Sequence, residues 1–120
     1  MKYELSQKFY FEAAHTLDRF IDAEGSKRIH GHTYHAEVTL ENASDLEDSM
    51  LIDLGFVHKE IARIRELLDH RFLDEVAGLG PATLENLCRY IFDQLVDMLP
   101  ALSRVAVERQ ASGDRCCLSR

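Results

Sequence analysis

The residues best suited to chemistry are three histidines in the first third of the chain. His30 and His32 lie two positions apart in HGHTYHAEVTL, a segment that alternates like a β-strand. Side chains two apart on a strand leave the same face, so both imidazoles can reach one cation. His15 follows the first predicted strand and is the candidate third ligand. Three neutral nitrogens with an open fourth position are typical of a catalytic zinc site, although three imidazoles also suit iron, nickel and copper.

The other histidines are less suited to this metal site. His35 alternates to the face opposite His30 and His32, and His58 falls on the surface of a predicted helix. Both are expected to be solvated. A bare HxH pair also arises by chance, so the metal prediction depends on His15 as well.

An adjacent carboxylate and imidazole, Asp69 and His70, close the first predicted helix. A neighbouring carboxylate can orient an imidazole and raise its basicity, which makes His70 a candidate general base. A histidine near a helix C-terminus is also favoured by the helix dipole. The dipeptide alone leaves both interpretations open. Thr83 and Glu85 open the second predicted helix, and capping alone explains that spacing.

The elements that must position these groups follow from the hydrophobic periodicity. Alternation predicts strands over 2–12 and 30–40, separated by a loop over 13–29. A helical period predicts helices from about 55 to 68 and from 83 to about 98. Two further strands are expected over 104–110 and 115–119. This order indicates an α+β fold, with an antiparallel sheet and the helices on one face.

The length of 120 residues favours a single domain over 1–120. With 46% hydrophobic and 29% charged residues, the composition excludes a disordered chain. A formal charge of −7 disfavours nucleic acid as a partner. The N-terminus lacks the apolar core of a signal peptide and no long apolar run occurs, so we expect a cytoplasmic protein with no membrane partner. The three cysteines are expected to be free thiols.

Several motifs together resemble one family. FEAAH (11–15), HGHTY (30–34), ID (52–53), LDHRFL (68–73) and PATLEN (81–86) have the order and approximate spacing of the 6-pyruvoyl-tetrahydropterin synthase / 6-carboxytetrahydropterin synthase family. The resemblance implies the tunnelling fold, a four-stranded antiparallel sheet with two helices. It also implies a homo-oligomer, commonly a trimer or a hexamer, whose sheets join into a β-barrel with active sites between subunits.

The resemblance also implies a chemistry. It places Zn²⁺ on His15, His30 and His32, assigns proton transfer to His70 with Asp69 orienting it, and puts Thr83 and Glu85 among the substrate-binding residues. The substrate of such relatives is 7,8-dihydroneopterin triphosphate. One branch eliminates triphosphate, and the other also breaks a carbon–carbon bond on the path to queuosine.

The sequence departs from that family pattern at the catalytic cysteine. Four residues before the first histidine of HGH, this chain has Ser26. A thiol has a reference pKa near 8.5, whereas an alkoxide is much harder to form. Ser26 is kept as a candidate catalytic residue at this position. Groups that could replace the thiol after a loop shift, or through folding, are Glu24, Lys27, Cys116 and Cys117.

A second departure concerns the glutamate that anchors the pterin in relatives. Counted from Thr83 without a gap, this position falls on Arg109, and Glu108 is its neighbour. Adjacent strand residues face opposite sides, so only one of the two enters a given pocket unless a bulge intervenes. A guanidinium only donates hydrogen bonds; it would reject a pterin edge and attract a carboxylate or phosphate.

Three functions are consistent with this pattern. The first is a zinc-dependent lyase or isomerase acting on a small anionic hydroxy-carbonyl substrate, held by Arg109. The second is a 6-carboxytetrahydropterin synthase that acts on 7,8-dihydroneopterin triphosphate and presents Glu108. The third is a catalytically silent zinc-containing binding protein.

Overall fold

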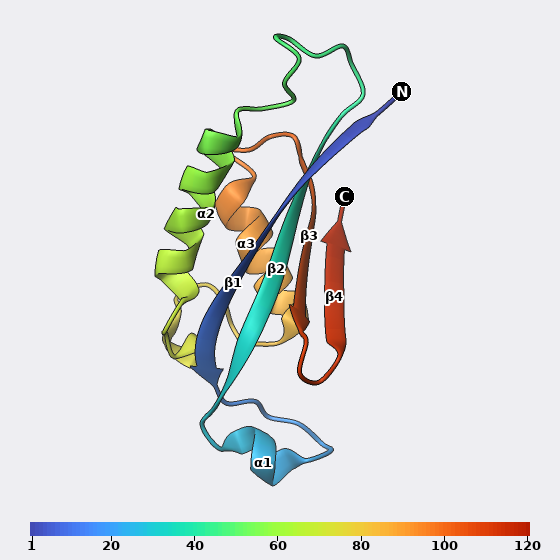
Figure 1. Ribbon diagram of the computed structural model, residues 1–120. Helices are drawn as coiled ribbons and strands as arrows, with labels where there is room; N and C mark the ends of the chain where they lie inside the picture. Colours follow the sequence, from blue (N-terminus) through green and yellow to red (C-terminus); the bar gives the residue numbers. More distant parts are fainter.

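The protein forms a four-stranded antiparallel sheet in the order β1-β2-β3-β4, with α2 and α3 on one face (Figure 1). The computed structural model describes residues 1–120. The elements are β1 (Tyr3–His15), α1 (Ala23–Lys27), β2 (His30–Asn42), α2 (Leu54–Leu68), the 3₁₀ turn η1 (Leu73–Glu75), α3 (Leu84–Leu95), β3 (Leu102–Arg109) and β4 (Asp114–Ser119). The predicted α+β fold, with helices on one face, is confirmed.

The core lies between the sheet and the two long helices. Alternate residues of β1 and β2 face the helices, and Phe11 stacks on its cross-strand neighbour Tyr34 at 5.1 Å between ring centroids. Both rings are buried. Burying an aromatic side chain of this kind stabilises the fold by roughly 2–3 kcal/mol, so the alternation decides which face of each strand points inward.

Each of the two long helices begins at a side-chain cap, of which the sequence analysis predicted Thr83. The Asp53 carboxylate accepts from the Gly55 N–H at 2.8 Å, and the Thr83 hydroxyl accepts from the Asn86 N–H at 3.1 Å. Each helix buries one apolar stripe, and α3 ends at Leu95, three residues before the predicted limit. None of the helices is long and apolar enough to cross a membrane.

The prediction for residues 13–29 was partly wrong. β1 continues to His15, because Ala13 pairs with His32 and His15 with His30 across the ladder. Residues 23–27 form the short helix α1. This helix has no side-chain N-cap and is too short to show an apolar period, so its sequence carries no helical signal.

The segment that follows α2 lies against the outer edge of β1. The Ala14 N–H donates to the Arg71 carbonyl at 3.0 Å, and the His70 N–H donates to the Glu12 carbonyl at 2.6 Å. Ala14 and Phe72 also form an isolated parallel bridge. Residues 69–74 therefore cover this edge only near its end, where the histidines are.

A bulge in β3 sets which of its residues face the helices. Thr39 pairs with Arg104 and Leu40 with Leu102, so Ser103 is the extra residue on β3. Beyond the bulge the ladder is regular, with Val107 buried on the helix side. Arg109 shares the face of Val107.

Candidate active site

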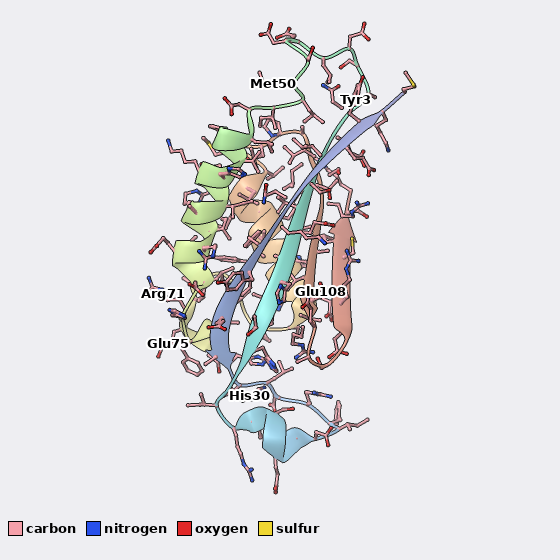
Figure 2. All side chains as sticks on the ribbon, viewed as in Figure 1. Tyr3, His30, Met50, Arg71, Glu75 and Glu108 are labelled. Atoms are coloured by element: carbon pink, nitrogen blue, oxygen red, sulfur yellow. The ribbon has the colours of Figure 1, made fainter.

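The three predicted metal ligands meet where β1 ends and β2 begins. One ligand nitrogen from each of His15, His30 and His32 lies within 4.8 Å of the others. His15 Nε2 and His32 Nε2 are 3.0 Å apart. Figure 2 shows His30 at the end of the sheet beside α1. The cross-strand pairing of His15 with His30 brings together ligands that are 15 residues apart in the chain.

The surroundings of His15 and His32 favour neutral imidazoles. The His30 Nδ1 donates to the Arg28 carbonyl at 2.7 Å, so in the neutral ring the lone pair is on Nε2. His15 is only 1% exposed, and its burial, followed by the charges of His30, His32 and Arg109, lowers its pKa to about 4. Burial and Arg109 also lower the pKa of His32. Neutral imidazoles are the form that binds a metal.

A zinc ion fits this donor set. Two nitrogens bound to one tetrahedral zinc at about 2.0–2.1 Å are about 3.4 Å apart, close to the His15–His32 separation of 3.0 Å.

His35, on β2, and His58, on α2, are not part of the trio, as the sequence predicts. His35 is beside the Tyr10 ring, and the His58 Nε2 contacts the Gln7 Oε1 at 3.0 Å.

His70 borders the same region as the trio. A hollow of about 610 Å³, called here the β1–β2 hollow, is lined by His32 and His70 together with Glu12, Thr33 and their neighbours. The candidate proton-transfer group His70 and the candidate metal ligand His32 therefore border one solvent-accessible space, although 38 residues separate them in the sequence.

Asp69 is less closely engaged with His70 than with the backbone of β1. Its Oδ1 is 4.0 Å from the His70 Nε2, beyond hydrogen-bond distance. The same Oδ1 accepts from the Glu12 N–H at 2.9 Å, and Oδ2 accepts from Arg65 at 3.3 Å. The Glu12 hydrogen bond is the main cause that lowers the pKa of Asp69, with the charges of His70 and Arg65 adding to it.

Arg109 and Glu108 face opposite sides of the sheet. Arg109 borders a hollow of about 540 Å³ together with His32, and its charge lowers the pKa of both His15 and His32. Its guanidinium donates to Asp114 at 3.0 Å, while its buried Nε has no hydrogen-bond partner. The residue on the side of the trio is thus Arg109.

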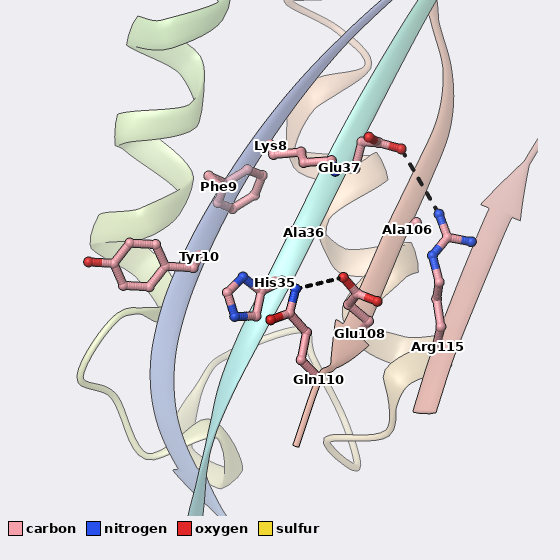
Figure 3. A pocket seen from close by; sticks show the side chains of 10 residues that line it. All are labelled: Lys8, Phe9, Tyr10, His35, Ala36, Glu37, Ala106, Glu108, Gln110 and Arg115. Atoms are coloured by element: carbon pink, nitrogen blue, oxygen red, sulfur yellow. Dashed lines mark hydrogen bonds and ion pairs between the residues drawn. The ribbon is translucent and has the colours of Figure 1, made fainter. Parts of the chain in front are cut away.

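Glu108 lies on the open face of the sheet (Figure 3). It borders a hollow of about 320 Å³ with Tyr10, His35 and Arg115. Gln110 donates to its Oε1 at 3.2 Å, which leaves its other oxygen without a protein donor. The lining of this hollow includes two carboxylates, Glu37 and Glu108, and the rings of Phe9, Tyr10 and His35, but no residue of the trio.

Ser26, Thr83 and Glu85 lie apart from the trio: none of them lines the β1–β2 hollow or the hollow beside Arg109, both of which His32 borders. Ser26 is buried in α1, where its carbonyl accepts from the Leu17 N–H at 2.7 Å. The Thr83 hydroxyl caps α3, and Glu85 is exposed on its first turn. Their roles remain predictions. Of the groups that could replace the thiol, Lys27 pairs with Asp18 at 3.6 Å, and Cys116 and Cys117 lie on β4.

Sequence reasoning missed the residues that hold the end of β1. Glu12 and Thr33 line the β1–β2 hollow. The Thr16 N–H donates to the Asp74 Oδ1 at 2.9 Å, and the Thr16 hydroxyl donates to the same carboxylate. The only available signal was membership of Glu12 in the FEAAH motif, which by itself gives no partner.

Comparisons with known proteins match this geometry. The family model described as 6-pyruvoyl tetrahydropterin synthase matches residues 4–117. A 6-carboxy-5,6,7,8-tetrahydropterin synthase from Synechocystis is 30% identical over 108 residues, covering 84% of this chain and 81% of the relative. A dihydroneopterin monophosphate aldolase from Pyrococcus furiosus is 27% identical over 100 residues, covering 83% and 81%.

The fold likeness extends over the whole chain. The solved structure of Caenorhabditis elegans 6-pyruvoyl tetrahydropterin synthase superposes with a TM-score of 0.85 at 24% identity, covering 100% of this chain and 96% of that one.

Proposed function

The chain belongs to the 6-pyruvoyl tetrahydropterin synthase family, and from this premise we propose that it is a zinc-dependent lyase or isomerase acting on a small anionic hydroxy-carbonyl compound. The observation that carries the proposal is the position of Arg109 on the face of the histidine trio, where its charge reaches His15 and His32. A cation beside the metal ligands favours an anionic substrate.

His15, His30 and His32 are the residues that would hold the zinc. When bound, zinc polarises a hydroxyl or carbonyl oxygen of the substrate and so makes the neighbouring C–H more acidic. His70, at the β1–β2 hollow, takes or returns the proton at that carbon. Asp69 stays ionised close by, because the Glu12 N–H hydrogen bond lowers its pKa, and its carboxylate lies beside the positive charge that forms on His70 when the proton is taken.

Arg109 would bind the anionic group of the substrate. Its Nε is buried without a hydrogen-bond partner, so the guanidinium keeps unused donor capacity. A guanidinium binds phosphate or carboxylate through paired N–H donors. The resulting chemistry is elimination, isomerisation or aldol cleavage next to the activated oxygen. The name of one relative, dihydroneopterin monophosphate aldolase, is consistent with a bond cleavage in a phosphorylated substrate.

A second candidate is the conversion of 7,8-dihydroneopterin triphosphate, as in a 6-carboxytetrahydropterin synthase. Glu108 favours it, because its carboxylate borders a hollow with the Tyr10 and His35 rings. A carboxylate in such a hollow can accept two N–H bonds from a planar heterocycle, and the rings can stack on it.

We further propose that the protein works in the cytoplasm as a homo-oligomer, a trimer or a hexamer. The outer edge of β4 and most of the outer edge of β1 have no strand beside them in one chain. Unpaired edges of this kind are satisfied when sheets of neighbouring copies join, as in the barrel that the family resemblance implies.

The deciding experiment is a turnover assay of the zinc-loaded protein. The substrates are 7,8-dihydroneopterin triphosphate, its monophosphate and dihydroxyacetone phosphate, with products identified by mass spectrometry. The variants are Arg109→Glu and Glu108→Gln, each also tested for zinc content. The leading proposal expects turnover of the phosphorylated hydroxy-ketone, lost in Arg109→Glu and kept in Glu108→Gln. Turnover of the pterin triphosphate, lost in Glu108→Gln and kept in Arg109→Glu, establishes the second candidate instead.

A further inference from the structure

We propose that Glu12 is the carboxylate that positions the imidazole of His70. This inference rests on the proposed function in one respect, that His70 transfers a proton. It assigns a residue outside the predicted catalytic set, and it separates the roles of two carboxylates that both lie near His70. Glu12 Oε2 is 3.7 Å from the His70 Nε2, and Asp69 Oδ1 is 4.0 Å from it, so both are ion-pair contacts longer than a hydrogen bond, and Glu12 is the nearer of the two.

The two carboxylates differ in the acceptor capacity that they have left. Asp69 uses Oδ1 for the Glu12 N–H and Oδ2 for the Arg65 guanidinium. Glu12 is fixed by one oxygen only, because the Thr33 hydroxyl donates to Oε1 at 3.3 Å. The Oε2 of Glu12 has no other donor, so it is the oxygen free to accept from an imidazole N–H.

The backbone of His70 also ties it to Glu12. His70 has φ of 57°, in the left-handed region that costs a non-glycine residue roughly 1–2 kcal/mol. Its N–H donates to the Glu12 carbonyl at 2.6 Å, which helps to hold this conformation. One residue of β1 thus contacts His70 through both its main chain and its side chain. Strained backbone of this kind is kept where the surrounding contacts fix it, and it is frequent at functional sites.

The chemical role follows from which ring nitrogen faces the carboxylate. The His70 Nε2 is the ring nitrogen that lies 3.7 Å from the Glu12 carboxylate, so the Nε2–H tautomer places its hydrogen beside that carboxylate and leaves the Nδ1 lone pair free to take a proton from a substrate carbon. The substrate keeps the electron pair of the broken C–H bond, and the imidazole becomes a cation. The Glu12 carboxylate stabilises that cation and the tautomer that precedes it, while Thr33 holds Glu12 in place.

A double-mutant cycle tests the coupling between the two residues. We expect Glu12→Gln to lower kcat about tenfold, with zinc content and KM unchanged, because the glutamine keeps the size and the Thr33 contact but loses the charge. In a His70→Ala background, Glu12→Gln should leave the small residual rate, measured at high enzyme concentration, unchanged. Glu4→Gln is the matched control, on the same strand and the same face. An unchanged kcat in Glu12→Gln, or equal losses in both backgrounds, overturns the proposal.

A second measurement does not need turnover. Two-bond ¹H–¹⁵N correlation spectra of the zinc-loaded protein at pH 8 report which ring nitrogen of His70 carries the hydrogen. We expect mainly the Nε2–H tautomer in the wild type and a larger Nδ1–H fraction in Glu12→Gln. An unchanged tautomer ratio overturns the positioning role, whatever the activity. If the tautomer shifts but the wild type converts no substrate, the positioning role stands and the proposed function fails.

Discussion

Asp69 Oδ1 accepts a hydrogen bond from the backbone N–H of Glu12 at 2.9 Å, 57 residues earlier in the chain. Two positions further along β1, the Ala14 N–H donates to the Arg71 carbonyl, and after two more the Thr16 N–H donates to the Asp74 Oδ1. Every second N–H group along this edge therefore donates to a residue of the segment after α2: to the Asp69 carboxylate, the Arg71 carbonyl and the Asp74 carboxylate in turn. These hydrogen bonds fix the end of the strand that carries His15.

The Asp69 carboxylate should make a pH-dependent contribution to stability. The hydrogen bond from Glu12, with the charges of His70 and Arg65, holds the pKa of Asp69 below its usual range. A group with a lowered folded pKa stabilises the protein fully above the unfolded pKa of about 4, and this contribution is lost as the pH falls through the folded pKa. We expect Asp69→Asn to reduce the free energy of unfolding by about 1 kcal/mol at pH 7, and by progressively less below about pH 4.

Urea denaturation at pH 7 and pH 3 measures this difference. Asp45→Asn is the control, since Asp45 is exposed in the loop that follows β2. A difference between wild type and Asp69→Asn that stays the same at both pH values contradicts the prediction.

Zinc binding should depend on the trio and on no other histidine. We expect about one zinc per chain in the wild type, and almost none in His30→Ala or His32→Ala, because two neutral nitrogens hold zinc much more weakly than three. His35→Ala and His58→Ala are matched controls that keep the metal, and His70→Ala should keep the metal and lose turnover. Atomic emission on dialysed protein gives the zinc content. Full occupancy in His30→Ala would falsify the assignment of the site.

Ser26 can be tested by restoring the thiol that the family resemblance implies at its position. We expect Ser26→Cys to raise kcat about tenfold on whichever substrate the wild type converts, because a thiol ionises far more readily than a hydroxyl. Ser26→Ala is the control, and it should show no gain. Steady-state rates at pH 8 with equal zinc loading provide the comparison. A Ser26→Cys variant no faster than wild type places Ser26 outside the chemistry.

The cysteines should differ strongly in reactivity. Burial, with a contribution from Cys116, raises the pKa of Cys88 to about 12, whereas Cys117 is exposed on β4. Alkylation needs the thiolate, so Cys88 should react with iodoacetamide at least about a thousandfold more slowly than Cys117 at pH 8. Peptide mass mapping over time measures both rates. Urea-unfolded protein is the control, in which the cysteines should react alike; comparable rates in the folded protein count against a buried Cys88.

The sequence was sufficient to predict which face of the sheet each strand side chain points to. It was also sufficient to predict that the three histidines of the trio come together. The alternation in β2 shows that His30 and His32 share a face, because a strand has a period of two. The same rule, applied from Val107, places Arg109 and Glu108 on opposite faces. The motif order was sufficient to identify the family, and the family model confirms it.

Contacts between distant segments could not be predicted in this way. The end of β1 was missed because Ala13 and Ala14 give no strand signal; they are strand residues because HGH lies opposite them. Glu12 lies on the polar face of β1, where a charge usually means only contact with water. Its partners Asp69 and His70 follow α2, at least 57 residues later in the chain. No local sequence pattern predicts that they contact Glu12.

The bulge at Ser103 puts Val105 and Val107 on the buried face of β3. Core packing therefore determines that Arg109, and not Glu108, lies beside the histidines. Val105 and Val107 are fully buried, so their side of β3 is the helix side, and Arg109 follows them in step. To bring Glu108 to the trio by strand slippage, the protein would have to expose both valines, at roughly 1.5–3 kcal/mol each. Thermal fluctuation will seldom populate that register. A substitution at residue 109 can therefore reverse the charge beside the histidines, whereas a shift of the strand register cannot do so without exposing the core.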